Sequence, residues 1–319
     1  MHSMNPKPPV FIQIDLDGLW AIRRCYGYPV GDGFVNDPIY TRALPFFREI
    51  LKKYHALSTL FVVGKDLEVQ EKARLLQDFI HEEHEIACHT YDHMIGLTQL
   101  SADDVHNDIQ RCRQSIRQIL QVDVNGFRAP GYAINTTVWQ VLAELGFRYD
   151  ASLLQTPWSG ILKKIVNSFI IHGSSRSRQF GKPIPASCPR IPFQLGAIDS
   201  FADEPFKGLW EIPVTVSPSL KLPVQISYAQ IGGARLFLRT AEYYRRHNLP
   251  LSCVFHGIDL VDTAHIEVLP GAPWYSSFFF RLSWKRKKKT IETIMDFLSR
   301  HFTPYTISQW LKMQGNDLK

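Results

Sequence analysis

The sequence predicts an α/β protein in which parallel strands form a sheet or barrel covered by helices. Apolar runs with β-branched residues alternate with amphipathic helical patterns over residues 10–153, and no internal repeat divides the chain. Strict alternation favours parallel strands, because each crossover between such strands needs a connection long enough for a helix. We expect a single domain over residues 10–311, with a flexible leader at 1–9 and a tail at 312–319.

The elements follow from the spacing of apolar residues. Short apolar runs that end in polar residues or turns predict strands at 10–16, 58–64, 85–90, 124–132 and 148–153. Apolar residues at helical spacing predict helices at 41–56, 66–84, 101–121 and 135–147. Ser101 is placed to cap the third helix, and Gly146 to stop the fourth. Parallel strands bring their carboxyl ends to one edge, where loops build the site.

Residues 154–208 interrupt the alternation. The segment is rich in Pro, Ser and Gly, and a loop of this length inside a compact domain commonly has a function. We predict a loop insertion that forms a wall of the substrate site. Regular structure resumes at 209–216, with a helix near 232–247, the apolar run 251–260, and a helix and strand within 290–311.

The composition is that of a soluble globular protein. The chain has 319 residues, of which 45% are hydrophobic and 21% charged, which allows an ample core. Its net charge is +6, and much of the excess lies in "WKRKKK" (284–289). This run carries no recognisable nucleic-acid-binding motif, so we expect no nucleic-acid partner.

Cysteine usage and the terminal sequence favour a cytoplasmic protein. The five cysteines are scattered and contain no CxxC, which is typical of reduced thiols rather than of a disulfide framework. Residues 1–10 lack the charged-then-apolar pattern of a signal peptide, and no apolar stretch approaches the ~18 residues of a membrane span.

Two histidines in "CHTYDH" have the spacing of a metal site when a carboxylate joins them. Alone, this spacing and the Asp-x-Asp of "IDLDG" are both common without a metal. A catalytic zinc takes three protein ligands, and His89, His93 and one aspartate satisfy that need. Asp15 and Asp17 point to the same face of a strand, so one can bind metal while the other acts as a base. The residues leave open which aspartate takes which role.

The ordered segments "IDLDG", "HTYDH", "RAPGY", "DASL" and "VFH" resemble the motifs of the polysaccharide deacetylase family, also called carbohydrate esterase family four. The resemblance covers roughly residues 10–311. It implies a distorted (β/α) barrel with a divalent-metal hydrolase site at its mouth.

The resemblance also implies ligands for the metal. Asp17, followed by glycine as in the family's motif, becomes the carboxylate ligand beside His89 and His93. Zinc is the expected ion, and cobalt, nickel, manganese or iron would fit the same ligands. The family has two adjacent aspartates, the first being the base, but Leu16 stands in that place here. The base role of Asp15 is therefore inferred from strand geometry.

Other matching positions imply roles in proton transfer and charge stabilisation. Arg128 would orient the base. Asp150 would pair with His256, which becomes the general acid. Tyr132, after Pro130, would offer its backbone amide or its hydroxyl to the developing oxyanion.

The resemblance is nearer to the branch of the family that acts on lipid-linked sugars, which includes the 4-deoxy-4-formamido-arabinose phosphoundecaprenol deformylase. It implies removal of an acetyl or formyl group from an amino sugar carried on a polyprenyl phosphate. The aromatic and basic stretch 273–289 then predicts peripheral contact with an anionic membrane at its inner face.

Two alternatives remain open at this stage. One is hydrolysis of a small cyclic amide, as in the allantoinase-like relatives. The other is a non-catalytic, sugar-binding barrel that has lost its base. The direction of Asp15 distinguishes the latter, because a side chain pointing away from the metal would leave the site without a base.

Overall fold

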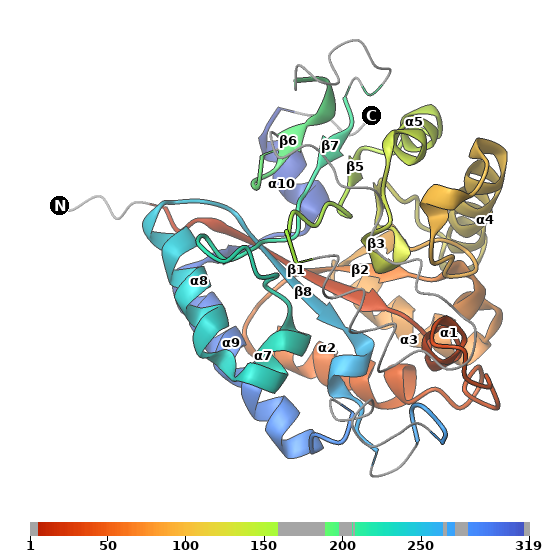
Figure 1. Ribbon diagram of the computed structural model, residues 1–319, viewed down its shortest axis with the longest axis horizontal. Coiled ribbons are helices and arrows are strands. Elements are labelled where there is room, and N and C mark those ends of the chain that lie inside the picture. Colours follow the sequence, from red (N-terminus) through yellow and green to blue (C-terminus); the bar gives the residue numbers. More distant parts are fainter. Residues whose placement is uncertain are drawn as a thin grey trace.

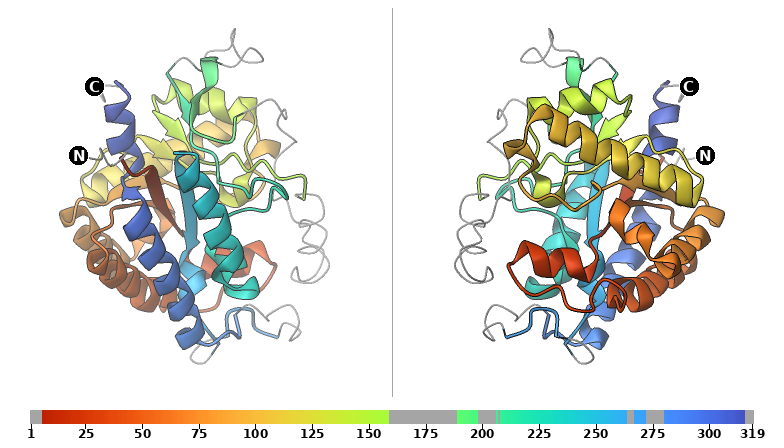
Figure 2. Two further views of the ribbon diagram at one scale, coloured as in Figure 1. Left: turned by 90° about the vertical axis from the view of Figure 1, so that its left-hand side faces the viewer. Right: turned by 90° about the vertical axis from the view of Figure 1, so that its right-hand side faces the viewer.

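The computed structural model describes residues 6–158, 189–197, 206, 208–263, 267–271 and 280–315. Its strands form one curled half-barrel sheet with helices around it, which confirms the predicted α/β barrel class (Figures 1 and 2). The strand order is β6-β7-β5-β4-β3-β2-β1-β8, and β9 pairs with β1. β6 pairs antiparallel with β7, whereas the other pairs are parallel.

The strands are short away from the centre of the sheet. They span Pro9–Leu16 (β1), Ser58–Val62 (β2), Glu85–Cys88 (β3), Gly126–Phe127 (β4), Tyr149–Asp150 (β5), Phe193–Gln194 (β6), Trp210–Glu211 (β7), Leu251–His256 (β8) and Thr303–Pro304 (β9). The long central strands β1, β2 and β8 lie side by side, so they form the rigid part on which the site is built.

The helices connect successive strands and cover the outside of the curl (Figure 2). They span Leu19–Cys25 (α1), Leu44–Lys53 (α2), Gln70–His81 (α3), Ala102–Leu120 (α4), Thr136–Glu144 (α5), Ile226–Gly232 (α7), Ala234–Arg246 (α8), Trp284–His301 (α9) and Ile307–Met313 (α10). Ser101 caps α4 as predicted, because its hydroxyl accepts a hydrogen bond from the Asp104 amide at 3.2 Å.

β1 passes through the centre of the core. Its residues are buried on both faces, as expected for a parallel strand covered on each side. Gln13 and Asp15 are its polar residues, and the Gln13 side-chain oxygen accepts a hydrogen bond from the Arg128 guanidinium. The polar interior of the curl therefore begins at Gln13, two residues before Asp15 on the same face of β1.

Four helices differ from the prediction, of which α1, α7 and α10 were not predicted at all. α1 follows the first motif directly and has only seven residues, which is too short for a helical periodicity to be visible. α9 begins at Trp284 rather than near residue 290, so "WKRKKK" forms its first turns. Ser283 caps it, with its hydroxyl accepting from the Arg286 amide at 3.4 Å.

Most of the predicted insertion at 154–208 lies outside the described residues. Within its described part, Phe193–Gln194 returns to the sheet as β6 beside β7. Its predicted role as a substrate wall stays a prediction. Among the described residues, no helix combines the length and apolar character that crossing a bilayer requires.

Candidate metal and catalytic site

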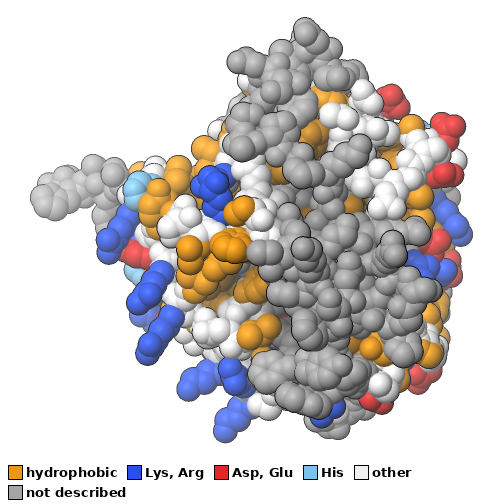
Figure 3. Space-filling view, in the orientation of Figure 1, with side chains coloured by type: hydrophobic (Ala, Val, Ile, Leu, Met, Phe, Trp, Pro, Cys, Tyr) orange, Lys and Arg blue, Asp and Glu red, His pale blue; other side chains and the backbone are white. Residues whose placement is uncertain are grey.

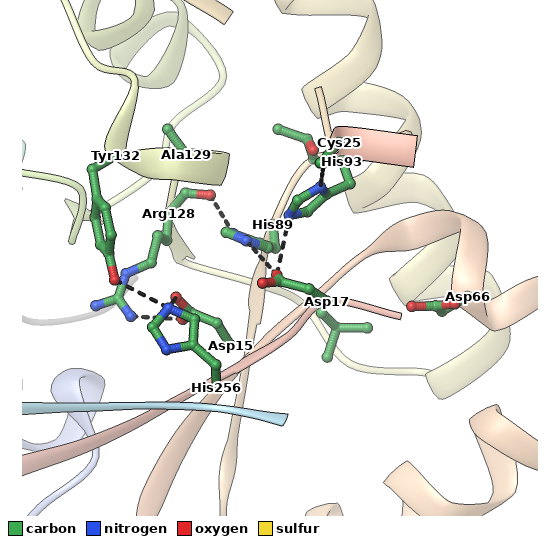
Figure 4. Close-up of polar contacts among 12 residues, drawn as sticks. Asp15, Asp17, Cys25, Asp66, His89, His93, Arg128, Ala129, Tyr132 and His256 are labelled. Atoms are coloured by element: carbon green, nitrogen blue, oxygen red, sulfur yellow. Dashed lines mark hydrogen bonds and ion pairs between the residues drawn. The ribbon is translucent and has the colours of Figure 1, made fainter. Parts of the chain in front are cut away.

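The candidate site lies where the parallel strands end. β1 carries Asp15 and leads into Asp17, and the register places Asp15 opposite His256 of β8. His89 follows β3, and the Arg128 amide donates to the carbonyl of the last residue of β3 at 3.0 Å. The side chains thus meet at one mouth, as predicted from the positions of polar residues at strand ends (Figure 4).

Asp17, His89 and His93 come together as one group. Asp17 Oδ1 lies 3.0 Å from His89 Nε2 and 3.1 Å from His93 Nε2. One ligand atom from each residue lies within 4.8 Å of the others. Both histidines are buried, and the Asp17 side chain is 16% exposed. The three residues that the motifs assign to a metal are therefore brought together at the mouth.

Hydrogen bonds fix the orientation of both imidazoles. His89 Nδ1 lies 2.8 Å from the Arg128 carbonyl oxygen, which can only accept, so Nδ1 carries the proton and Nε2 offers its lone pair. His93 Nδ1 lies 3.3 Å from Cys25 Sγ on α1. Thr90 and His93 have positive φ angles of 63° and 49°, a strained conformation that turns the histidine loop back towards Asp17.

The donor set fits a divalent cation. Asp17 Oδ1 is buried and has no hydrogen bond of good geometry among the described residues, although two imidazole nitrogens lie close to it. Ligand atoms around a tetrahedral zinc ion are about 3.3 Å apart, because its bonds to nitrogen and oxygen are ~2.0–2.2 Å long. The observed separations approach that spacing, so these residues could hold such an ion.

Electrostatics at the triad favour a positive charge there. Burial alone would raise the pKa of the Asp17 carboxyl, but the two histidines hold this pKa well below its ordinary range. Burial lowers the pKa of His93, and Cys25 and Asp17 more than reverse the effect and raise it to about 9. Without a metal the triad therefore retains a proton, which an incoming cation would displace.

Asp15 is held by Arg128 beside the triad. Arg128 Nη1 donates to Asp15 Oδ1 at 2.6 Å, and its Nε donates to the Ala151 carbonyl at 2.9 Å. The remaining guanidinium nitrogen, Nη2, donates to Gln13 Oε1. The Asp15 carboxylate faces the mouth rather than away from it (Figure 4), which is the orientation that a base requires.

His256 lies between two carboxylates. Its Nε2 is 3.7 Å from Asp15 Oδ2, and its Nδ1 is 3.7 Å from Asp259 Oδ2. Asp259 is fully buried and accepts from the His256 backbone amide at 2.8 Å and from the Ser227 hydroxyl at 2.6 Å. Burial opposes protonation of the ring, but Asp259 and Asp15 raise the pKa of His256 to about 9.

The predicted pairing of Asp150 with His256 is wrong, because Asp259 occupies that position. Asp150 instead accepts from Trp139 Nε1 at 2.9 Å and from the Ser152 hydroxyl at 2.5 Å. Ser152 in turn accepts from the Ala129 amide at 2.8 Å. Burial raises the pKa of Asp150, against these hydrogen bonds. Asp150 therefore supports the turn that carries Arg128.

Only the hydroxyl of Tyr132 faces the site. The Tyr132 backbone amide donates to the Ala129 carbonyl at 3.0 Å, so the predicted use of this amide for an oxyanion is wrong. The hydroxyl lies 3.3 Å from His256 Nε2 and accepts from Gln225 Nε2 at 2.6 Å. Pro130 is buried and begins the short turn that places this ring, so its contribution is indirect.

Comparison with known sequences points to one family. The family model described as polysaccharide deacetylase matches residues 34–149. The chain is 30% identical over 112 residues to the peptidoglycan-N-acetylglucosamine deacetylase of Bacillus cereus, which covers 35% of this chain and 49% of that protein. It is 25% identical over 145 residues to a peptidoglycan deacetylase of Helicobacter pylori, covering 44% and 47%. These matches support the polysaccharide deacetylase family.

The polysaccharide deacetylase match covers only part of this chain, and the chain covers only part of its relatives. It contains His89, His93 and Arg128 but begins after the two aspartates and ends before His256. The chain spans less than half the length of the curated relatives it matches, including 15% of a bifunctional xylanase/deacetylase of Pseudobutyrivibrio xylanivorans, to which it is 30% identical over 92 residues covering 29% of this chain.

A solved structure confirms the fold. The crystal structure of a Mycobacterium smegmatis protein described as a polysaccharide deacetylase aligns with a TM-score of 0.61 at 16% identity, covering 100% of this chain and 94% of that one. At this identity the likeness concerns the architecture alone.

Three residues of the site were not anticipated from the sequence. Asp259 belongs to none of the five motifs, although its spacing from His256 in "HGID" is that of a helical turn. Gln225 and Cys25 carry no motif at all. Their positions depend on how α7 and α1 pack across the mouth, which local spacing does not reveal.

Proposed function

We propose that the protein is a metal-dependent hydrolase that removes an N-acyl group, acetyl or formyl, from an amino sugar. The observation that carries the proposal is the convergence of Asp17, His89 and His93, with their ligand atoms within 4.8 Å, beside the Asp15–Arg128 pair and His256. A divalent ion held there would supply Lewis acidity, activating a water molecule and polarising the acyl carbonyl.

Asp15 is the general base of this mechanism. Its Oδ2 faces the mouth, while Arg128 binds Oδ1 at 2.6 Å. The guanidinium fixes the direction of the carboxylate, because a hydrogen bond between two charged groups is strong and directional. Asp15 then takes the proton from the attacking water.

His256 is the general acid. Its pKa of about 9 keeps the ring protonated at neutral pH, so it can deliver a proton to the leaving amine. Asp259 is a positioning residue, because its carboxylate lies at Nδ1 and leaves Nε2 facing the mouth. The two roles are separated by charge environment: Asp15 lies against a fixed cation, and His256 lies against fixed anions.

The Tyr132 hydroxyl is the protein donor for the developing oxyanion. Burial raises the pKa of this phenol well above its ordinary value, so it keeps its proton. Gln225 already donates to the oxygen, which leaves the phenolic hydrogen free to point at His256 or at a substrate. Such a donor stabilises the charge that develops on the acyl oxygen.

A lipid-linked amino sugar, on a polyprenyl phosphate and reached from the cytoplasmic face, is the finer form of this proposal. It is supported by the sequence resemblance to that branch, and by the basic run that opens α9. The aromatic half of the predicted contact segment 273–289 lies largely outside the described residues. Its two described aromatics turn inward: Phe280 is buried, and Trp284 packs against Phe46 with ring centroids 5.7 Å apart.

A non-catalytic sugar-binding barrel is disfavoured by one observation. Asp15 faces the mouth and is bonded to Arg128, so the group whose loss would define that alternative is in place. Hydrolysis of a small cyclic amide uses the same kind of site and is separated from the proposal by substrate alone.

Metal content is the first test. Elemental analysis of the purified wild type should find one divalent ion per chain, and His89→Ala should lose it. The loaded wild type should then release acetate or formate from N-acylated amino sugars, with lipid-linked ones tested beside free oligosaccharides. Absence of metal from both proteins, even after zinc is added, would overturn the proposal and favour the binding barrel.

A further inference from the structure

Four exposed apolar side chains gather beside the candidate site. Among the described residues, Leu220, Tyr228, Ile231 and Leu236 are large hydrophobic side chains that remain 38–55% exposed. They lie on α7, at the start of α8 and on the turn before α7. Figure 3 shows apolar side chains gathered over these helices, with Lys and Arg bordering them. A single exposed leucine needs no explanation, but a cluster of this kind does.

The border of this cluster is basic up to the middle of α8, where Glu242 pairs with Arg245 and Arg246. Residues 217–241 and 281–291 together hold nine Lys and Arg and no Asp or Glu. Five of these cations are exposed and have no carboxylate within ion-pair distance in the described part of the chain: Arg235, Arg239, Lys285, Arg286 and Lys289.

α9 and α7 form one continuous surface. Arg286 Nη2 donates to the Gln230 carbonyl at 3.5 Å, which joins the basic start of α9 to the end of α7. Not all of the basic run contributes: the Lys287 ammonium is buried and donates to the Val261 carbonyl at 2.6 Å. The exposed charge is thus carried by Lys285, Arg286 and Lys289, on the side that α7 shares.

This surface adjoins the mouth of the site. A groove of about 110 Å³ is lined by residues that include Leu222, Gln225, Tyr228 and Leu236. Gln225 at one side of the groove donates to the Tyr132 hydroxyl, which lies 3.3 Å from His256 Nε2. An amphiphilic molecule held at the groove would therefore have a short path to the candidate catalytic residues.

We propose that α7, the first half of α8 and the first turns of α9 form a docking surface for an anionic lipid bilayer, here called the α7–α9 surface. Its apolar side chains insert at the headgroup boundary, and its unpaired cations meet anionic lipid. This charge balance fits a lipid surface better than a protein partner, because the apolar cluster is small and its border carries one sign of charge. The inference does not depend on N-acyl hydrolysis.

Vesicle flotation with the full chain tests the proposal. Wild type should float with vesicles containing phosphatidylglycerol, float poorly with pure phosphatidylcholine, and lose binding as salt is raised. Arg235→Glu/Arg239→Glu should lower the partition coefficient at least about 25-fold, since each basic residue contributes about fivefold near such a surface. Ile231→Ser/Leu236→Ser should lower it about tenfold.

Matched controls separate this surface from general effects of charge and hydrophobicity. Arg117→Glu/Lys312→Glu changes the net charge equally on distant exposed positions, and Ile119→Ser removes an apolar side chain that is 40% exposed on α4. Both should float like the wild type, and so should the metal-site variant His89→Ala, which keeps this test distinct from that of the proposed function. Equal binding by both surface variants and wild type would overturn the proposal. So would an absence of wild-type binding, or charge-dependent binding on which Ile231→Ser/Leu236→Ser has no effect.

Discussion

Two buried polar groups lie on opposite sides of the loop that follows β1, and they differ in how completely their atoms are paired. In the first, Asp17 meets His89 and His93, and Asp17 Oδ1 has no well-formed hydrogen bond among the described residues. In the second, Lys72 donates to Asp37 Oδ2 at 2.8 Å and to Asp66 Oδ1 at 2.5 Å.

In the second group, here called the lysine cluster, the carboxylate oxygens all accept hydrogen bonds from nearby donors. Asp66 also accepts from Trp20 Nε1 at 2.8 Å and from the Tyr40 hydroxyl at 3.2 Å, so both of its oxygens are used. Asp37 accepts from backbone amides as well. A buried polar group that satisfies its own partners supports the fold, whereas one with an unsatisfied ligand atom is available for a cation.

Gly18 is the point where the two groups approach each other. A Cβ at this position would lie 2.7 Å from Asp66 Oδ1 and 2.7 Å from Trp20 Nε1. The glycine that follows Asp17 is thus required by close packing against the lysine cluster. The comparison predicts that substitutions in the Asp17–His89–His93 group lower metal binding, whereas substitutions in the lysine cluster lower the free energy of unfolding.

The largest expected effect is on the group formed by Asp17, His89 and His93. His89→Ala should abolish metal binding and lower activity at least ~10³-fold, because Lewis-acid stabilisation contributes several kcal/mol. Elemental analysis and turnover of an N-acylated amino sugar measure the two losses. His81→Ala, on the exposed end of α3, is the matched control and should change neither. Full activity without metal would contradict the assignment of the triad.

Lys72→Met should lower the free energy of unfolding while leaving Asp17, His89 and His93 in place. It leaves two buried carboxylates without their cation, which costs about 3–5 kcal/mol in the free energy of unfolding. Denaturant unfolding measures the loss, and Arg74→Met, in an exposed pair on the same helix, should leave the midpoint unchanged.

The pH dependence of this variant sharpens the comparison. Burial, opposed by Lys72, raises the pKa of Asp37 to about 6, above its unfolded value, so folding favours the protonated form. Without Lys72 this pKa should rise further. The destabilisation by Lys72→Met should therefore shrink as the pH falls from 8 towards 5.5. A penalty that grows over this range would show that the carboxylates are paired in another way.

Tyr132→Phe should have a smaller effect, about 100-fold on kcat, which is the usual loss when one oxyanion donor is removed. KM should change little, because the bond forms to the charge that develops in the transition state. Steady-state kinetics measure both constants, with Tyr54→Phe, whose hydroxyl donates to the Glu292 carbonyl on the outside of the barrel, as the control. A change in KM alone would indicate substrate binding by this hydroxyl instead.

The parts of the site that could be predicted from the sequence are those set by local spacing. The order of strands and helices up to residue 153, and the grouping of Asp17 with His89 and His93, follow from residues near one another in each motif and from the rule that parallel strands end together. The predictions that needed packing across the mouth were less successful. Asp150 was assigned to His256, but a short turn after β8 folds Asp259 back against the ring. The Tyr132 amide was predicted to bind an oxyanion, but in the turn at Pro130 it donates to the Ala129 carbonyl.

The membrane contact predicted for 273–289 stays a prediction, because four of its six aromatic residues lie outside the described part of the chain. Phe280 and Trp284 belong to an aromatic and basic stretch that is typical of a membrane contact, yet both turn inward. Whether an aromatic side chain faces solvent depends on what lies across from it, here Phe46 of α2, and the stretch itself carries no such information. A group of exposed apolar side chains lies instead on α7 and at the start of α8.

The smallest expected effect on rate tests the assignment of Asp259. Asp259→Asn keeps an acceptor for the His256 amide but removes the charge at Nδ1, so the pKa of His256 should fall from about 9. Because the general acid must be protonated, the alkaline limb of kcat/KM should move to lower pH. Activity at pH 8 should drop about tenfold, part of the ~10²–10⁴ that a general acid contributes.

A merely structural role for Asp259 would lower activity equally at all pH values and leave the limb in place. Asp103→Asn, on the exposed first turn of α4, removes the same charge at a distance and should not move the limb. Asp150→Asn completes the comparison between the two candidate partners. If it shifts the limb further than Asp259→Asn does, the sequence-based assignment of Asp150 would be restored. If it changes only the rate, its role is to hold the Arg128 turn through Ser152.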